Sequence, residues 1–353
     1  MNARAGHPER SEGSVSRQGS STLAARAKRS LAALGMTLLL TSTSALAQTH
    51  VVIVSGLGGE KKYHDSFIQI SQSIATAANK RWGIPDTAIV WLGEDSVSRA
   101  PYFRGQSTKV NVERIVGQIA AKAAQGEQFI LILVGHGSGE GEDSKISIPG
   151  PDLSARDFAQ LLAKFPTQKV AFVDLTSASG DILPIVSAPN RVVITATKSS
   201  FERNESRFAQ FFADALSKDV ADADKDGRVS LLEAYRYALI ETKRVYDSDT
   251  RLQTEHAQLD DMGAKNGVAD PDGRTGQGLL ARRFFFDAGM SKAAGNDPRI
   301  AALYKDKFAL EDQIDSLKLK KTAMNADSYD DALEALLVQL ARKSKTIREM
   351  EGR

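Results

Sequence analysis

Short apolar runs alternate with amphipathic stretches through residues 50–216, and this alternation limits the fold more than any other feature. The apolar runs have the length of buried strands, and the stretches between them carry apolar side chains at helical spacing. Strands that alternate with helices in this way form a mostly parallel sheet with helices on both faces. We therefore expect strands at 51–55, 88–92, 129–134, 170–174 and 191–195, and helices at about 63–80, 111–124, 153–164 and 205–216.

The pattern changes after the last of these helices. An acidic loop leads into a long helical stretch at about 231–247, and an apolar run at 282–286 predicts one more strand. Residues 288–297 have the composition of a linker. The chain that follows the N-terminal segment is therefore expected to consist of an α/β domain at 48–287, the linker, and a helical segment at 298–353.

The C-terminal segment carries apolar residues at heptad spacing in two stretches with a break between them. Two such helices joined by a short loop are typical of an antiparallel coiled-coil hairpin, and a pair of helices packed on the main domain fits the pattern equally well. Either arrangement offers a surface for self-association or for a partner. The heptad residues are Ile300, Leu303, Leu310, Ile314 and Leu317 in the first stretch, and Leu333, Leu337, Leu340 and Ile347 in the second.

The first 47 residues have the pattern of a secretory signal peptide. Three basic residues at 26–29 precede an apolar run at 31–40, and residues 45–47 read Ala-Leu-Ala, the form of a cleavage site. The apolar run is shorter than the ~20 residues that a membrane span needs. We therefore expect an exported protein, periplasmic or secreted, that does not span the membrane after cleavage at residue 47.

The chain contains no cysteine, which excludes disulfide bonds, thiolate metal ligands and thiol nucleophiles. Residues 1–47 hold six basic and two acidic residues, so the remaining chain has 40 basic and 42 acidic residues, with no basic stripe. A near-neutral body of this kind lacks the electrostatic footprint of a nucleic-acid-binding protein. We therefore expect no nucleic-acid partner.

Residues 222–233 fit the calcium-binding loop of an EF-hand at every constrained position, with Gly227 at the turn. Four carboxylates within this loop repel one another unless a cation neutralises them, so we expect calcium as a cofactor. A solvated acidic turn at a helix start is the alternative. In order of position, the ligands would be the side chains of Asp222, Asp224 and Asp226, the backbone carbonyl of Arg228, and the side chains of Ser230 and Glu233.

Two strand ends carry residues suited to chemistry. The strand at 129–134 runs into His136, which lies between two glycines, and the strand at 170–174 runs into a hydroxyl-rich stretch that ends at Gly180. Catalytic and binding groups of open parallel sheets gather beyond the carboxyl ends of the strands. An imidazole between glycines at such an end is poorly placed to belong to the core, so His136 is a candidate site residue.

These two elements resemble the legumain family of the caspase-type peptidases. In that family one apolar strand ends in His-Gly, and a later strand ends in the nucleophilic Cys before a Ser-Gly pair. Here His136 and Gly137 match the first element, and residues 170–180 match the second in strand, spacing and final Ser-Gly pair. The resemblance implies a caspase-like fold over about residues 50–215, a peptide or protein ligand, and His136 and Ser177 at the catalytic positions.

Weaker matches extend the resemblance. Tyr63 and His64 follow the first strand much as a Tyr-Arg-His element does in legumains, and residues 83–86 precede the second strand as a near-verbatim match. Residues 196–197 followed by Glu205 resemble the segment that supplies an acidic residue to the substrate pocket. The resemblance therefore places His64 and Glu205 in the pocket. Because legumains have arginine where this chain has His64, their preference for asparagine does not carry over.

The departure at residue 177 decides the functional prediction. Ser177 stands where the family has its cysteine, and a hydroxyl has no anionic population comparable to that of a thiol, whose pKa lies near ~8.5. A hydroxyl attacks only when an oriented base is hydrogen-bonded to it. We therefore expect a pseudo-peptidase that acts by binding. A hydrolase or transpeptidase that uses Ser177 and His136, and an unrelated α/β protein, are the alternatives; Thr176 and Ser179 are alternative hydroxyls.

Overall fold

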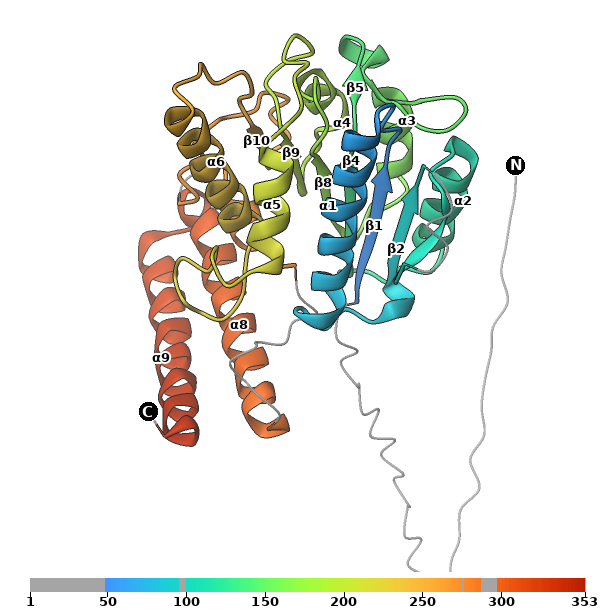
Figure 1. The fold of residues 1–353 in the computed structure, drawn as a ribbon. Helices are drawn as coiled ribbons and strands as arrows, with labels where there is room; N and C mark the ends of the chain where they lie inside the picture. Colours follow the sequence, from blue (N-terminus) through green and yellow to red (C-terminus); the bar gives the residue numbers. More distant parts are fainter. Residues whose placement is uncertain (1–47, 95–99, 275, 287–296, 353) are drawn as a thin grey trace, which may run out of the picture. The chain divides into compact units, whose positions relative to one another are not determined.

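The computed structural model describes residues 48–94, 100–274, 276–286 and 297–352. Its centre is a sheet with strand order β10-β9-β8-β4-β1-β2-β3 (Figure 1). Neighbouring strands are parallel, apart from β10, which pairs antiparallel with β9. The strands are β1 (Thr49–Ser55), β2 (Ile89–Gly93), β3 (Phe103–Gln106), β4 (Gln128–Val134), β8 (Lys169–Asp174), β9 (Arg191–Thr195) and β10 (Gln258–Asp260).

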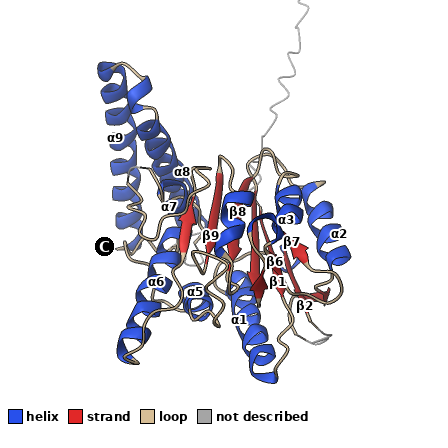
Figure 2. Ribbon diagram, turned by 90° about the horizontal axis from the view of Figure 1, so that it is seen from above, coloured by secondary structure: helices blue, strands red, loops and turns tan. Residues whose placement is uncertain are grey.

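The helices cover both faces of this sheet (Figure 2). Thr108 caps α2 by accepting a hydrogen bond from the Asn111 N–H at 3.3 Å, and Ser154 caps α3 in a capping box with Asp157. The helices are α1 (Lys61–Lys80), α2 (Lys109–Ala120), α3 (Ala155–Leu162), α4 (Leu183–Val186), α5 (Phe208–Ser217), α6 (Leu231–Ser248) and α7 (Leu279–Arg282). A small antiparallel sheet contains β5 (Gly137–Ser138), β6 (Lys145–Ile146) and β7 (Leu153–Ser154).

The central strands are buried on both sides. Ile53 of β1 and Ile132 of β4 belong to one apolar cluster with α1, α5 and α6, whereas Val54 and Leu133 belong to the other cluster with α2, α3 and α4. Successive side chains of a strand point to opposite faces, so a strand buried on both faces needs apolar residues at every position. This explains why the sequence shows continuous apolar runs there rather than polar–apolar alternation.

The predicted fold class is confirmed: the sheet is mostly parallel, helices lie on both faces, and a helical segment follows at the C-terminus. The five predicted strands correspond to β1, β2, β4, β8 and β9. The apolar pattern does not predict β3 and β10, because β3 is half exposed and β10 has three residues. The predicted signal segment at 1–47 lies outside the described residues, as does the predicted linker up to residue 296.

The predicted strand at 282–286 is wrong. Residues up to Arg282 belong to α7, and the residues that follow make only an isolated bridge, in which the Leu231 N–H donates to the Phe284 carbonyl at 2.8 Å. Phe284 and Phe286 are nevertheless buried, because they join the apolar cluster beside α6. The apolar pattern in the sequence thus reflects burial against a helix and a loop, without a sheet.

The C-terminal segment forms an antiparallel helical hairpin of α8 (Pro298–Leu319) and α9 (Ala326–Glu351). Tyr304 and Phe308, early in α8, pack against Ile347, late in α9. The same hairpin is attached to the α/β domain, since Arg283 donates a hydrogen bond to Ser316 of α8 at 3.0 Å. The two helices therefore pack on each other as a hairpin, and α8 also packs on the domain, while coiled-coil packing of the heptad residues stays a prediction.

Candidate functional site

The loops after β4 and β8 meet at the carboxyl edge of the sheet. These strands are parallel neighbours, with Leu133 opposite Asp174. The Gly137 N–H donates a hydrogen bond to Ser177 Oγ at 3.4 Å. A Cβ at position 137 would lie 2.2 Å from the Ser177 carbonyl oxygen, so the approach of the two loops requires glycine there. The fold therefore brings the loop of His136 and the loop of Ser177 together at one edge.

The ring of His136 is held by aromatic contacts. It packs edge-on against Tyr63 and Phe67 of α1, with ring-centroid distances of 4.8 and 5.0 Å. Among the described residues, neither ring nitrogen has a hydrogen-bond partner. A general base for a serine needs a hydrogen bond to the hydroxyl and a second group that orients its other nitrogen. Neither requirement is met in this arrangement.

Ser177 lies in a tight and buried turn, with 3% of its surface exposed. The next residue, Ala178, has a φ of 54°, in the left-handed region that a residue with a Cβ adopts at an energetic cost. The Ala178 N–H donates to the carbonyl of Glu202 at 2.8 Å, which fixes this turn to the loop after β9. The hydroxyl is thus rigidly placed and shielded from solvent.

The two alternative hydroxyls have structural partners. Thr176 Oγ1 donates to the carboxylate of Asp174 at 2.6 Å. Ser179 Oγ accepts hydrogen bonds from the Ala196 N–H at 3.1 Å and the Thr197 N–H at 3.2 Å, so it ties the loop after β8 to the loop after β9. Both side chains therefore satisfy buried polar groups, as Ser and Thr commonly do at turns.

Asp174 is a buried carboxyl group beneath the Ser177 turn. Burial raises its pKa to about 7, and the hydrogen bonds that it accepts from the N–H and Oγ1 of Thr176 oppose part of that shift. Sequence reasoning counted Asp174 only as the last residue of a strand. Its burial depends on the elements that close over the strand end, which no local pattern reveals.

Glu202 and His256 form a second imidazole–carboxylate pair beside the site. His256 Nδ1 lies 2.5 Å from the Glu202 carboxylate, which also accepts the Lys198 N–H at 2.9 Å. The carbonyl of Glu202 holds Ala178, so this pair braces the Ser177 turn from the far side. The sequence separates the partners by 54 positions, and neither lies in a motif, so sequence reasoning missed both.

His64 and Glu205, which the family resemblance places in one pocket, are engaged with different partners. His64 Nδ1 lies 2.9 Å from Glu94, whereas Glu205 forms an ion pair with Lys62 at 3.1 Å. Lys62 and His64 are two positions apart on α1 and so face different directions. Glu205 lines a pocket of about 670 Å³ between α1, α5 and the end of α6, and His64 is not among the residues that line it.

Glu94 is held as a carboxylate by its neighbours. Burial acts to raise its pKa, but hydrogen bonds from the Gly58 N–H at 2.9 Å and from His64 outweigh burial, so that the pKa is lowered. A Cβ at Gly58 would lie 2.4 Å from the backbone nitrogen of His64, which explains a glycine at this position. Glu94 thus fixes the loop after β1 against the start of α1.

The predicted calcium ligands are partly gathered. Asp222, Asp224 and Asp226 each offer an oxygen within 4.8 Å of the others. Glu233 accepts the Ala223 N–H at 3.0 Å with one oxygen, and with the other it forms a capping box with Ser230 at the start of α6. Burial, together with the neighbouring charge of Asp224, raises the pKa of Asp226 to about 6. This donor set of hard carboxylate oxygens suits calcium.

Arg228 connects the loop to the C-terminal hairpin. Its guanidinium lies over the ring of Phe285 at 3.4 Å and over the ring of Phe308 in α8 at 4.1 Å, and the residue is buried. The loop departs from an EF-hand on its N-terminal side, because α5 ends at Ser217, before the loop begins at Asp222. On its C-terminal side α6 begins within the loop, as the motif requires.

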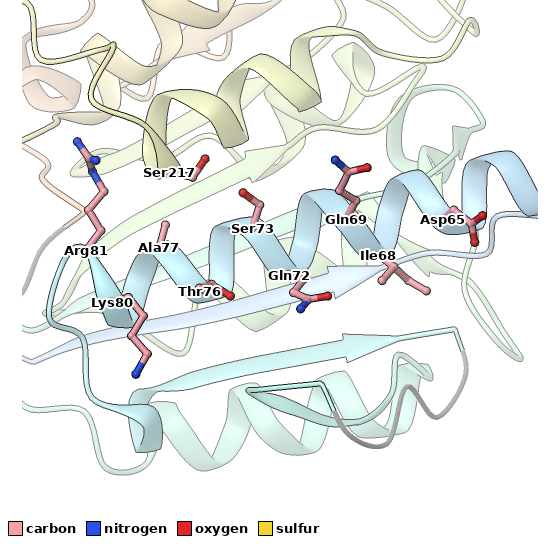
Figure 3. Close-up of a pocket in the computed structure, with 10 residues that line it drawn as sticks. All are labelled: Asp65, Ile68, Gln69, Gln72, Ser73, Thr76, Ala77, Lys80, Arg81 and Ser217. Atoms are coloured by element: carbon pink, nitrogen blue, oxygen red, sulfur yellow. The ribbon is translucent and has the colours of Figure 1, made fainter.

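A larger hollow, of about 780 Å³, lies along the outer face of α1 (Figure 3). Most of the residues that line it are of polar type, among them Gln69, Gln72, Ser73 and Thr76. Neither His136 nor Ser177 lines it, and it gathers no set of groups suited to acid–base or nucleophilic chemistry. The His136 and Ser177 loops at the carboxyl edge of the sheet are therefore not part of this hollow.

No family model matches the chain, and no curated protein matches it. The solved structures whose chains follow a similar course include the following two. The Drosophila initiator caspase Dronc has 11% sequence identity and a TM-score of 0.40, and the similarity covers 67% of this chain and 84% of that one. Protein GSU0716 from Geobacter sulfurreducens has 12% identity and a TM-score of 0.42, with coverage of 68% and 98%.

Among the residues that the structure describes, none of the helices combines the length and the apolar character needed to cross a membrane.

Proposed function

We propose that the protein is an exported pseudo-peptidase of the caspase type, which binds a peptide or protein segment at the carboxyl edge around His136 and Ser177. In this proposal the loop at 222–233 holds calcium. Export is supported by the basic and apolar pattern of residues 1–47, and the caspase-type assignment by the order of the His136 and Ser177 elements on neighbouring strands.

The observation that carries the proposal is the state of Ser177. Its hydroxyl is buried and accepts a hydrogen bond from Gly137, while the ring of His136 packs edge-on against two aromatic rings. Without a hydrogen-bonded and oriented base, a hydroxyl loses the general-base assistance that is worth about 10²–10⁴-fold in rate. The arrangement therefore supports retention of the edge for binding.

Exposed apolar side chains on the neighbouring loops support a peptide ligand. Phe201 is 76% exposed and Leu252 is 89% exposed. Their loops are tied to each other by the Glu202–His256 pair and by Glu255, which accepts hydrogen bonds from Ser206 and from two backbone N–H groups. In this proposal, these exposed side chains supply apolar contact to the bound peptide.

Peptide turnover and capture by the purified chain from residue 48 onward test this function. We expect no cleavage of a pool of random peptides by wild type, and the same result for Ser177→Ala. We expect wild type to retain a subset of the pool, and Phe201→Ser combined with Leu252→Ser to reduce that retention at least ~5-fold through lost apolar contact. Ile240→Ser, at an apolar position on α6 that is 63% exposed, is the control.

Cleavage by wild type that Ser177→Ala abolishes would instead establish the serine hydrolase. Retention of no peptide by wild type would refute the binding function.

Calcium should raise the melting temperature of the protein. A ligand at 100 times its Kd that binds only the folded state adds about 2.7 kcal/mol, which corresponds to roughly 5 °C for a domain of this size. Glu233→Gln should remove most of this gain, because the amide keeps the capping box at Ser230 but loses the charge that calcium requires.

Differential scanning calorimetry with calcium and with a chelator measures the effect, and Glu241→Gln, on the same helix, is the control. Identical melting curves in the two solutions would refute calcium binding.

A further inference from the structure

The outer face of α9 carries a charge pattern that is complementary to itself. Residues at alternating steps of three and four line one face of a helix. On α9 one such stripe is exposed along its whole length, and its order is acid, acid, apolar, apolar, base, base. The members of this stripe, which we call the outer stripe, are Asp331, Glu334, Val338, Ala341, Lys345 and Arg348.

The side chains of the outer stripe are exposed in the described part of the chain. The opposite face of α9 packs on α8, where Tyr329 and Ile347 are buried (Figure 1). Among the described residues, Asp331, Glu334 and Arg348 have no ion-pair partner, and Lys345 has only an exposed contact with Glu349 at 3.7 Å. At the centre of the stripe Val338 is 41% exposed, and Leu337 on its flank is 47% exposed.

We propose that α9 pairs with α9 of a second copy of this chain in an antiparallel, two-fold symmetric dimer. A two-fold axis near the middle of α9 places Val338 against Ala341 of the other copy, Glu334 against its Lys345, and Asp331 against its Arg348. Each contact then occurs twice, as an isologous interface requires. The contacting stretch is about 26 Å long at 1.5 Å per residue, and its apolar centre is small. The dimer is therefore weak and depends on salt.

A parallel arrangement is disfavoured by the same residues, because it sets the acidic half against the acidic half and the basic half against the basic half. The charge order along the helix thus selects the antiparallel partner. This inference does not depend on peptide binding at Ser177 or on calcium, because none of its residues lies at either site.

Sedimentation equilibrium of the chain from residue 48 onward, in constant calcium, tests the proposal. Wild type should dimerise reversibly, and raising the salt from about 0.05 M to about 0.5 M should weaken the dimer about 10-fold. Glu334→Lys alone and Lys345→Glu alone should each weaken it about 10-fold or more, because each places like charges in contact twice. Lys305→Glu, on an exposed position of α8, should leave the dimer unchanged.

Rescue distinguishes charge pairing from damage to the helix. The double variant Glu334→Lys/Lys345→Glu should recover dimerisation, because the exchanged charges are again opposite between copies. A mixture of the two single variants should form the mixed dimer in preference to either homodimer. Wild type that stays monomeric over about two decades of concentration at low salt overturns the proposal. Single variants that dimerise like wild type, or a double variant that is not rescued, overturn it as well.

Discussion

Ser177→Cys should turn an unreactive protein into one that is alkylated by a peptidyl chloromethyl ketone, at least ~100-fold faster than wild type. The reason is the difference between the two nucleophiles: a thiol ionises near pH ~8.5, whereas a hydroxyl needs a base that the ring of His136 does not provide in this arrangement. The Gly137 N–H, which donates to the residue-177 side chain, would stabilise the thiolate. Because the chain has no cysteine, the variant carries a single thiol and the adduct mass assigns the reaction.

Two controls make this result specific. Ser328→Cys places the same thiol on an exposed turn of α9, where it should react at the rate of an ordinary surface cysteine. Ser177→Cys combined with His136→Ala should react about 10-fold more slowly than Ser177→Cys alone, because the imidazole that favours the thiolate is lost. If Ser177→Cys reacts no faster than Ser328→Cys, the edge has lost more than its nucleophile. Rapid alkylation of wild type would instead support the serine hydrolase.

The sequence predicted the sheet well because its strands are buried on both faces. Continuous apolar runs mark such strands directly, and parallel order then follows from the helices between them. Parallel strands end at the same edge of the sheet, so the residues that follow β4 and β8 were expected there. The family resemblance then singled out Ser177 together with His136. The failure at 282–286 has the same origin, because Phe284 and Phe286 are as apolar and as buried as strand residues but pack beside α6.

The parts of the site that were missed depend on contacts between distant segments. Glu202 and His256 come together because β10 pairs with β9, and the local sequence of neither segment predicts that pairing. The resemblance placed His64 in one pocket with Glu205. In the structure, Lys62 pairs with Glu205, whereas His64, two positions further along α1, points in another direction and contacts Glu94. A cluster within one loop is easier to predict from the sequence. The aspartates at 222, 224 and 226 lie close together because they belong to the same short loop.

The buried carboxyl of Asp174 should make the protein less stable as the pH rises through neutrality. Its pKa is about 7 in the folded chain against 3.8 for an unperturbed aspartate, so between these values the folded state binds the proton that the unfolded state has released. The unfolding free energy therefore falls as pH increases from about 4 to about 7, by an amount on the order of 4 kcal/mol once Asp174 is ionised.

Asp174→Asn removes this titration, and its amide oxygen can still accept the two hydrogen bonds of Thr176. In urea unfolding, the variant should be more stable than wild type by a few kcal/mol at about pH 8 and nearly equal to it at about pH 4.5. Asp143→Asn, an exposed position, should leave the wild-type difference between the two pH values unchanged. Other buried acids, such as Glu255, contribute to the slope of both proteins and cancel in the comparison. A variant that gains no stability at the higher pH would show that Asp174 is ionised at no cost, and that groups around it compensate the charge.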